Sequence, residues 1–433
     1  MHRTLVFLFL LAFKGILSQS DSCSANGKKS KLCDSSSQNE WSPQKTNKYL
    51  LYDVNPGEGF NLRRDVYMRV ATVVKILNQQ DKLNHWTLVL PPWGPLYHWK
   101  TKNIGFQAQL QWSRFFDVPS LAKYVPVVEL EDFLNDYGSS VDALYYLQNY
   151  AEGWTDVGWE EKYHFRDCVE SPPYKHTVEG NFIGWFWGYD DISAKKFHCL
   201  SIQGYSSTLA KFLMSRNESA IMIDRAEVIL HDTFGDAEYW LVRRSMVFSK
   251  KLTELGDVFR KFYLNSSDKV DKTEKKSVSN RAHRTAVGGP YVAVHLRRRD
   301  FVSARPKEVP SMKWASEQIL KYLKMYKLQK VFVASDASES EFLELKSYIP
   351  DAIQFVPTLN VHRDILDGGV AIVDQWICAH GRFFIGTFES TFSFRIQEER
   401  ELLGFKAETT FNRLCGDNQT SCQQPSKWTI VYK

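Results

Sequence analysis

GGPYVAVHLRRRD, residues 288–300, is the stretch that decides the fold. Its apolar centre, Tyr291–Arg297, has the length and β-branched content of a buried strand. From there to the C-terminus, strand-like and helix-like segments alternate. We predict strands at Lys330–Asp336, Gln354–Pro357 and Arg382–Thr387, and helices at Met312–Tyr326, Glu339–Ile349, Gly368–His380 and Ser390–Leu403. This alternation predicts a doubly wound α/β domain over residues 286–433, with ligands at the carboxyl ends of its strands.

The chain upstream repeats the alternation less regularly. A strand is expected at Tyr49–Val54, a helix at Leu62–Leu77, a strand at Thr87–Pro92 and a helix from Glu131. This order favours a second Rossmann-like domain with a parallel sheet, over residues 48–264. Residues 265–285 are polar and charged without an apolar period, which is typical of a solvated loop or linker. We therefore expect two domains that face each other across a cleft.

Composition excludes some classes of protein. The chain has 433 residues, 43% of them hydrophobic, as in a globular protein. Its net charge of +5 is too small to argue for nucleic-acid binding. The aromatic share of 14% fits either core packing or stacking on sugar rings, and composition does not choose between them.

The N-terminus predicts the compartment. His2 and Arg3 precede a short apolar run and small residues at 18–20, so residues 1–20 resemble a signal peptide. Residues 21–47 are polar and are expected to form a mobile lead-in. No apolar run is long enough to span a bilayer, which needs roughly 20 residues. We expect a lumenal or secreted protein with no membrane span.

Seven cysteines and three sequons fit an oxidising compartment. Sequence alone does not fix the pairing. Neighbouring cysteines that are able to form local bridges are Cys23 and Cys33, Cys168 and Cys199, and Cys415 and Cys422. Cys378 lies in an apolar helical stretch and is expected to be a buried thiol. The N-glycosylation candidates are Asn217, Asn265 and Asn418. The sequence ends without a KDEL-like retrieval signal.

The loop NPGEGFN, Asn55–Asn61, lies between a predicted strand and a predicted helix. Glycines permit close backbone approach, and a helix N-terminus attracts anions. A carboxylate between Gly57 and Gly59 suits a base beside a phosphate better than a phosphate ligand. An ordinary βα turn with a solvated Glu58 remains the alternative.

The segment HLRRRD, residues 295–300, ends the deciding strand. His295 and Arg297 share one side of it, because side chains alternate along a strand. Arginine binds diphosphates well, since its planar fork contacts two oxygens and keeps its charge. An exposed basic patch is the alternative for these arginines.

Two further segments carry candidates. Asp374 is a lone acid in an apolar helix, where burial demands a partner. An arginine is one solution, and the N1–H and N2–H donors of guanine are another. Ser390 is a plausible helix N-cap, and Thr391 falls in the first turn, whose free N–H groups suit phosphate. Capping is the simpler role for Ser390 alone.

Six motifs in order resemble the protein O-fucosyltransferases, in the branch that modifies thrombospondin type 1 repeats. They cover about residues 49–428 and read NPGEGFNLRRD, LPPWGPLYHW, GWFWGY, GGPYVAVHLRRRDF, DGGVAIVDQWICAH and STFSFRIQEERE–LG. The resemblance implies a GT-B-like fold that binds GDP-fucose in its interdomain cleft and needs no metal. The chain contains no D-x-D triplet, in agreement. It also implies a folded repeat as acceptor, residence in the endoplasmic reticulum lumen or the Golgi, and inverting transfer.

The resemblance assigns roles to residues of this chain. Glu58 falls on the catalytic base and Arg297 on the phosphate-binding arginine. Asp374 falls on the guanine-recognising acid. The other donor contacts fall on Gly57, Gly59, Phe60, Asn61, His295, Leu296, Ser390, Thr391 and Phe392. Gly57 stands where the family leads us to expect proline. The family pattern supports bridges Cys168–Cys199 and Cys415–Cys422, whereas Cys23 and Cys33 lie outside it.

Overall fold

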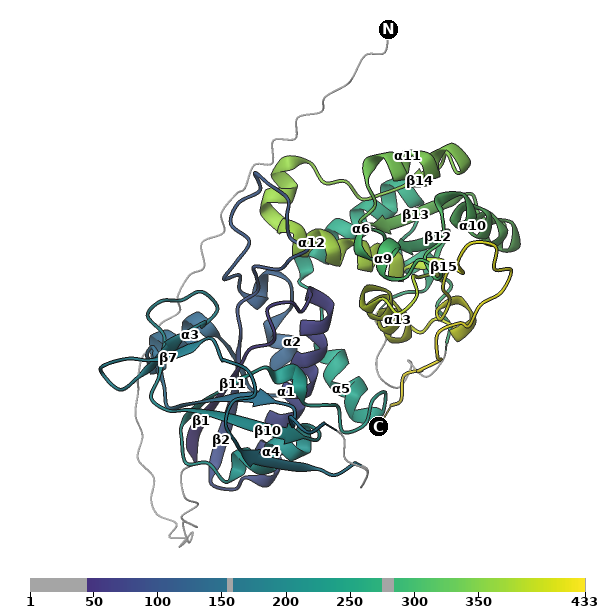
Figure 1. Cartoon of the computed structure of the whole chain (residues 1–433). Helices are drawn as coiled ribbons and strands as arrows, with labels where there is room; N and C mark the ends of the chain where they lie inside the picture. The colour runs from purple at the N-terminus through teal and green to yellow at the C-terminus, as the bar shows by residue number, and fades with distance from the viewer. Residues whose placement is uncertain (1–44, 154–158, 275–283, 433) are drawn as a thin grey trace, which may run out of the picture. The chain divides into compact units, whose positions relative to one another are not determined.

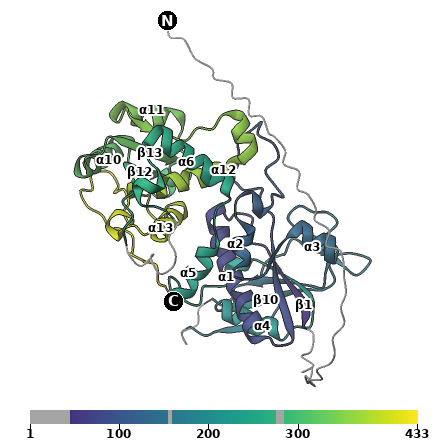
Figure 2. The same ribbon diagram turned by 180° about the vertical axis from the view of Figure 1, so that it is seen from behind.

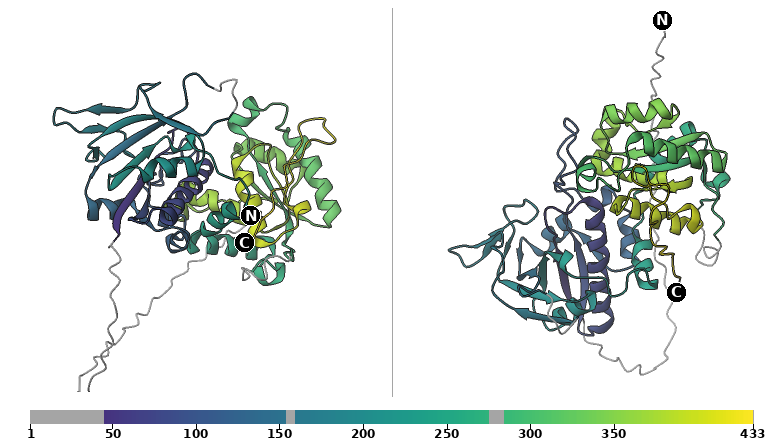
Figure 3. Two further views of the ribbon diagram at one scale, coloured as in Figure 1. Left: turned by 90° about the horizontal axis from the view of Figure 1, so that it is seen from below. Right: turned by 45° about the vertical axis from the view of Figure 1, so that its right-hand side comes forward.

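The computed structural model describes residues 45–153, 159–274 and 284–432. The predicted signal peptide, most of the predicted lead-in, and Cys23 and Cys33 lie outside these residues. Within them the chain forms two main sheets from separate stretches, coloured purple to teal and green to yellow (Figure 3). Both sheets belong to one structural unit, Gln44–Lys433.

The first sheet has seven strands in the order β3-β2-β1-β11-β5-β10-β6. Every neighbouring pair is parallel except β10 with β6, so the predicted parallel sheet is confirmed apart from one edge. β1 begins two residues inside the segment expected as lead-in, because Thr46 and Asn47 already pair with β2. The strands are β1 (Thr46–Tyr52), β2 (Asn84–Leu90), β3 (Val127–Glu129), β5 (Ala143–Gln148), β6 (Lys162–Phe165), β10 (Phe197–Gln203) and β11 (Ala220–Asp224).

Helices cover both faces of this sheet. On one face, α1 (Phe60–Gln80) packs along α4 (Ser206–Met214), as Figure 2 shows from behind. Most of the apolar positions that predicted α1, among them Val66, Val70 and Leu77, are completely buried, and Leu62 is partly buried. On the other face lie α3 (Leu130–Tyr137) and a small sheet of β4 (Ser140–Val141), β9 (Ser193–Ala194), β8 (Phe182–Gly184) and β7 (Tyr174–His176).

The second sheet is fully parallel, in the order β14-β13-β12-β15 (Figure 1). Its strands are β12 (Gly289–Leu296), β13 (Lys330–Ser335), β14 (Ala352–Ile353) and β15 (Gly381–Ile385). One face carries α10 (Met312–Tyr326) and α11 (Glu339–Tyr348). The other carries α6 (Lys250–Leu264) and α12 (Leu359–Ala379), which contacts α13 (Thr391–Leu403). Helices on both faces confirm the doubly wound prediction.

One predicted strand was displaced, and one predicted helix has a further helix before it. The short strand expected at Gln354–Pro357 lies instead at Ala352–Ile353, where the edge makes only two pairs with β13. Phe355 then leaves the sheet and packs against Phe259 of α6. The helix expected at Gly368–His380 is present and is preceded by another: α12 runs from Leu359 to Ala379, and the non-helical Leu366 (φ 60°, ψ −179°) marks a kink between the two parts.

The linker predicted over residues 265–285 is not simply a solvated loop in the first of its two described stretches, residues 265–274. A short helix, α7 (Asp268–Asp271), forms there, and Ser266 and Asp271 are buried. The reason is the buried guanidinium of Arg260, which bonds Ser266 and Asp268 and pairs with Asp271. Polar residues of this segment therefore provide the hydrogen-bond and ion-pair partners of the buried Arg260.

One apolar cluster runs through both halves of the unit. It includes Tyr52 and Leu88 of the first sheet and Ile372, Trp376 and Phe384 of the second half. Within this cluster, Gly256 lets α6 pack closely against Trp376 of α12, because a Cβ at position 256 would lie 2.6 Å from the Trp376 ring. The two sheets thus share a continuous core.

The order of strands fixes where a ligand is expected to bind. In the first sheet the order reverses between β1 and β11, and in the second between β12 and β15. Loops leaving such a pair of strands diverge and open a crevice at the carboxyl edge of the sheet. The segments that follow β1, β12 and β15 carry Glu58, Arg297 and Ser390.

Candidate active site

A cavity of about 590 Å³ gathers the segments that follow these strands. Its walls come from the loop after β1, the ends of β12 and β13, the middle of α12, the start of α13 and residues 97–101. Nearly every predicted donor contact lines it: Gly57, Glu58, Gly59, Phe60, Asn61, His295, Arg297, Asp374, Ser390, Thr391 and Phe392. Residues separated by more than 300 positions therefore share one pocket.

Glu58 presents a carboxylate with no hydrogen bond within the described part of the chain. Only its backbone is held: its N–H donates to Asn55 O at 2.9 Å, and its carbonyl accepts from Arg63 Nε at 3.0 Å. Burial raises the pKa of the Glu58 carboxyl, and nearby Glu227 raises it further. A half-buried carboxylate with a raised pKa and no partner is suited to accept a proton.

Arg297 lines the same pocket and is held firmly in place. Its guanidinium pairs with Asp336 and Asp300, and its backbone N–H donates to Thr387 Oγ1 at 3.0 Å. The side chain is 13% exposed and lies over the Phe301 ring. The alternative of an exposed basic patch is excluded for Arg297, which lines the pocket.

His295 is a neutral member of this wall. Burial lowers its pKa to about 3, and Arg297 contributes to the shift. Its Nδ1 shares a 2.8 Å hydrogen bond with Ser393 Oγ, and its ring stacks on Phe392 at 4.3 Å. The prediction that His295 and Arg297 share one side of β12 is confirmed, since both line the pocket.

Asp374 lies in α12 and is partly open to the pocket. The structure gives its carboxylate neither an arginine nor any other partner among the described residues. Burial raises its pKa well above the usual range for an aspartate. A carboxylate in this setting is stabilised by a ligand that brings two N–H donors.

The start of α13 departs from the simpler prediction. Ser390 is the N-cap residue, but its side chain makes no capping hydrogen bond and the residue lines the pocket instead. The first-turn N–H groups, from Thr391 onward, thus lack a side-chain acceptor. The N-terminus of this 13-residue helix is open to an anion from the pocket.

Leu296 is the predicted donor contact whose side chain the structure does not bring to the pocket. As the residue between His295 and Arg297, it points to the opposite face of β12. There it packs in the apolar cluster with Met312 and Ile319 of α10. Its role is in the core.

Sequence reasoning missed several pocket residues. His98 lines the cavity, and burial, with Arg297 adding to the effect, lowers its pKa to about 4. Asp336, at the end of β13, accepts from the Arg298 backbone N–H at 2.6 Å besides pairing with Arg297. Asp336 could have been found from the sequence, because it ends a predicted strand and ligands are expected at the carboxyl ends of such strands. His98 lies in the motif LPPWGPLYHW, to which the sequence pattern assigns no individual role.

The structure contains the disulfides Cys168–Cys199 and Cys415–Cys422, and Cys378 is a buried free thiol. The sequon residues Asn217, Asn265 and Asn418 are all exposed. No helix in the described ranges is both long and apolar enough to cross a bilayer.

Two parallel sheets with a polar pocket at their switch points define the GT-B-like class of folds. The model of the family "GDP-fucose protein O-fucosyltransferase" matches residues 49–403. GDP-fucose protein O-fucosyltransferase 2 of Homo sapiens is 50% identical over 391 residues, covering 89% of this chain and 90% of the human protein. The protein of the same name from Caenorhabditis elegans is 46% identical over 403 residues, covering 91% and 92%.

Among solved structures, the crystal structure of POFUT1 in complex with GDP matches with a TM-score of 0.53 at 17% identity. The match covers 86% of this chain and 99% of POFUT1. It supports the fold. On the family model and the relatives, this chain belongs to the GDP-fucose protein O-fucosyltransferase family.

Proposed function

We propose that the chain transfers fucose from GDP-fucose to a serine or threonine hydroxyl of a folded thrombospondin type 1 repeat. The observation that carries the proposal is that one pocket is lined both by a Glu58 carboxylate without a partner among the described residues and by a fixed Arg297 guanidinium. The relatives at 46–50% identity, all named O-fucosyltransferases, supply the reaction class.

Three features suit the nucleotide. The open N-terminus of α13 and the Arg297 fork would bind the diphosphate. The unpaired carboxylate of Asp374 would accept the N1–H and N2–H of guanine, and this pairing would repay its desolvation. The stacked rings of His295 and Phe392 line the same pocket and offer a flat surface to the nucleotide.

The chemistry is a single displacement with inversion. The acceptor oxygen attacks the anomeric carbon of fucose, forming the new C–O bond as the bond to the β-phosphate oxygen breaks. Glu58 takes the hydroxyl proton as the new bond forms, because a hydroxyl is too weak an acid to lose it earlier. Arg297 compensates the charge that grows on the departing GDP.

We propose further that this transfer needs no divalent metal. Arg297 and the α13 N-terminus would supply the positive charge that the departing diphosphate requires. A chelator should therefore leave the initial rate unchanged, whereas loss of activity that returns with added Mg²⁺ or Mn²⁺ would contradict this part of the proposal.

The experiment is an acceptor panel with GDP-[¹⁴C]fucose. It compares a folded thrombospondin type 1 repeat, the same repeat reduced and unfolded, and a folded epidermal-growth-factor-like repeat, with Glu58→Ala as the matched inactive enzyme. We expect label in the folded thrombospondin repeat alone. Label in the epidermal-growth-factor-like repeat would favour the alternative acceptor. Binding of GDP-fucose and repeat without label would favour an inactive lectin-like or chaperone-like module.

We propose the endoplasmic reticulum lumen as the compartment. Two disulfides and three exposed sequons suit an oxidising, glycosylating environment. Glycans on the expressed chain that endoglycosidase H removes would support this location. Resistance of those glycans would indicate residence beyond the early Golgi.

A further inference from the structure

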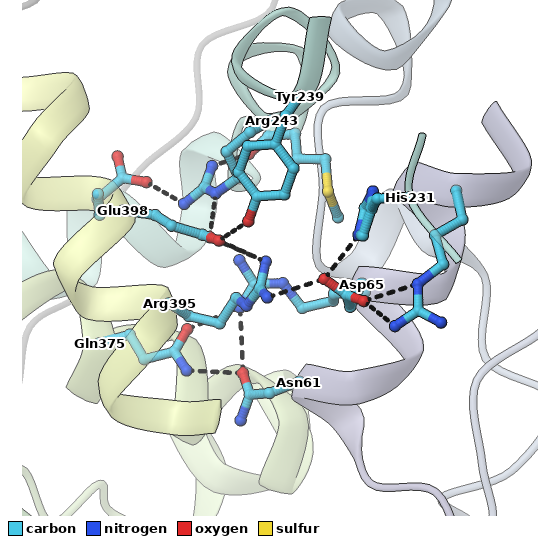
Figure 4. A network of polar contacts seen from close by, with 12 residues as sticks. Asn61, Asp65, His231, Tyr239, Arg243, Gln375, Arg395 and Glu398 are labelled. Atoms are coloured by element: carbon cyan, nitrogen blue, oxygen red, sulfur yellow. Dashed lines mark hydrogen bonds and ion pairs between the residues drawn. The ribbon is translucent and has the colours of Figure 1, made fainter. Parts of the chain in front are cut away.

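A buried polar network joins the first half of the unit to the second behind the pocket (Figure 4). Its larger part contains three arginines and three carboxylates: Arg243 pairs with Glu398 and Glu399, Arg395 pairs with Glu398 and Asp65, and Arg69 pairs with Asp65. Removing one partner of such a buried pair typically costs about 3–5 kcal/mol. This part is sufficiently explained as a structural lock between α1, α5 (Ala237–Ser245) and α13.

Arg64 is different, because it is fully buried without a carboxylate partner. Its Nη1 donates to Gln375 Oε1 at 2.8 Å and to Asn61 Oδ1 at 3.3 Å, while Nε and Nη2 find no acceptor among the residues that the structure describes. Its guanidinium carbon lies 5.1 Å from the ring centre of Phe248 and 5.5 Å from that of Phe116. Burial lowers the pKa of Arg64 well below its usual range. So costly a cation calls for a role beyond packing.

The atoms that Arg64 and Gln375 contact fix the amide of Asn61. Gln375 Nε2 donates to Asn61 Oδ1 at 2.8 Å, so this oxygen accepts from two donors. Arginine has no acceptor atom, which makes the opposite assignment of the Asn61 amide unfavourable. In Figure 4 the oxygen of Asn61 faces the network and its nitrogen points away from it.

The Asn61 Nδ2 group has no hydrogen-bond partner within the ranges that the structure describes, and Asn61 lines the pocket. A chain from a cation through an amide also polarises the far N–H groups, which strengthens them as donors. Asn61 is thereby prepared to donate to an oxygen of a bound molecule.

We propose that Arg64 and Gln375 are positioning residues that hold the Asn61 amide with its N–H groups toward a donor-substrate oxygen. The inference rests on the proposed function, because that oxygen belongs to GDP-fucose. It is either a diphosphate oxygen or a fucose hydroxyl, and both accept the same hydrogen bond. Asn61, which would contact the substrate, lies on α1, whereas Gln375, which holds it, lies on α12.

Gln375→Glu tests the orientation directly. The new carboxylate still accepts from Arg64 but no longer donates to Asn61 Oδ1, so the Asn61 amide turns and its nitrogen faces the network. The variant should keep its melting temperature, since Arg64 gains an ion pair. We expect kcat/KM for GDP-fucose to fall about 10- to 100-fold, the value of one hydrogen bond to a charged group.

A double-mutant cycle separates positioning from a structural role. In an Asn61→Ala background, Gln375→Glu should change kcat/KM less than about threefold, because the group it orients is gone. The same full loss in that background, or wild-type kinetics of Gln375→Glu alone, would overturn the proposal. Gln148→Glu is the matched control: this buried glutamine also donates and accepts, but it does not line the pocket.

Arg64→Met gives an independent arm that does not depend on the carboxylate. Methionine fills the aromatic surroundings of Arg64 and removes an unpaired charge, so the variant should melt no lower than wild type. The turnover of Arg64→Met should nevertheless fall. The turnover of Arg64→Lys should fall less, because lysine keeps a hydrogen-bond donor. Wild-type turnover in Arg64→Met would contradict the proposal.

GDP titration by calorimetry identifies the oxygen and separates this inference from the proposed function. Weaker GDP binding by Gln375→Glu points to the diphosphate, whereas unchanged GDP binding with a raised KM for GDP-fucose points to the sugar. A wild-type chain that does not transfer fucose contradicts the proposed function. A wild-type chain that does, beside an unaltered Gln375→Glu, contradicts only the positioning role.

Discussion

The two faces of the pocket are built in opposite ways. On the phosphate face, formed by residues 295–300 and 387–393, Arg297 is held by two carboxylates and a hydroxyl. On the base loop, residues 55–61, the Glu58 side chain is held by nothing that the structure describes. Groups that bind a donor gain from being fixed in advance, because ordering them later costs entropy. A group that must take a proton from a second substrate gains from being free and poorly solvated.

The largest expected effect is at the base loop. Glu58→Ala should lower kcat by about 10²–10⁴-fold, the usual contribution of a general base. Its raised pKa predicts that kcat/KM of the wild-type chain falls as pH drops through that pKa, because the protonated form accepts no proton. Initial rates between pH 4 and 8 measure both. Near wild-type turnover by Glu58→Ala would sink the assignment, and Glu344→Ala, an exposed acid on α11, is the control.

On the phosphate face, Arg297→Ala should lower kcat by about 10²–10³-fold, since it removes charge stabilisation of the leaving group. Arg297→Lys should recover only part of the rate, because an ammonium group lacks the planar fork that Asp336 and Asp300 hold in place. Rates and melting curves of the three proteins check this. Equal rates for the alanine and lysine variants would deny that the charge matters.

At Asp374 we expect a smaller effect that acts on binding. Asp374→Asn should weaken GDP binding about 10- to 100-fold, since a neutral amide offers guanine one acceptor where the carboxylate offers two. The raised pKa gives the pH dependence its sign: binding by the wild-type chain weakens as pH falls through it. Calorimetry from pH 5 to 8 should show this slope for wild type and a flat profile for Asp374→Asn. A slope that survives the substitution would assign the titration elsewhere.

The smallest expected effect tests whether the base loop must be flexible. Gly57 donates its N–H to Asn55 Oδ1 at a weak 3.3 Å, and a side chain there meets only that atom, at 3.8 Å. Gly57→Pro, the residue we expected from the family, should therefore change kcat less than about threefold while stiffening the loop. A tenfold loss in steady-state rate would mean that Glu58 relies on motion of this loop.

The sequence pattern correctly predicted the elements whose formation depends on residues close together in the chain. The periodic burial of α1 and the apolar runs of β12 and β13 follow from residues within one element. The first described stretch of the linker was misjudged because its polar residues serve Arg260, whose own need for partners does not appear in a window of local sequence.

The site divides in the same way. The residues at strand ends and helix starts, such as Glu58, Arg297 and Thr391, were found because parallel strands bring their carboxyl ends together. Arg64 and Gln375 were not found, since a buried arginine on an apolar helix carries no sequence signal of its partner 311 positions away. Spatial pairing across two halves of a chain is visible only in the folded structure.

The division between a fixed phosphate face and a free base loop is tested most directly by titrating GDP into Glu58→Ala and Arg297→Ala in parallel. Glu58→Ala should bind GDP within about twofold of wild type although it turns over almost nothing. Arg297→Ala should bind GDP at least about tenfold more weakly, because it loses a charged hydrogen-bond donor to the diphosphate. Loss of GDP binding in Glu58→Ala, with Arg297→Ala unaffected, would contradict the division.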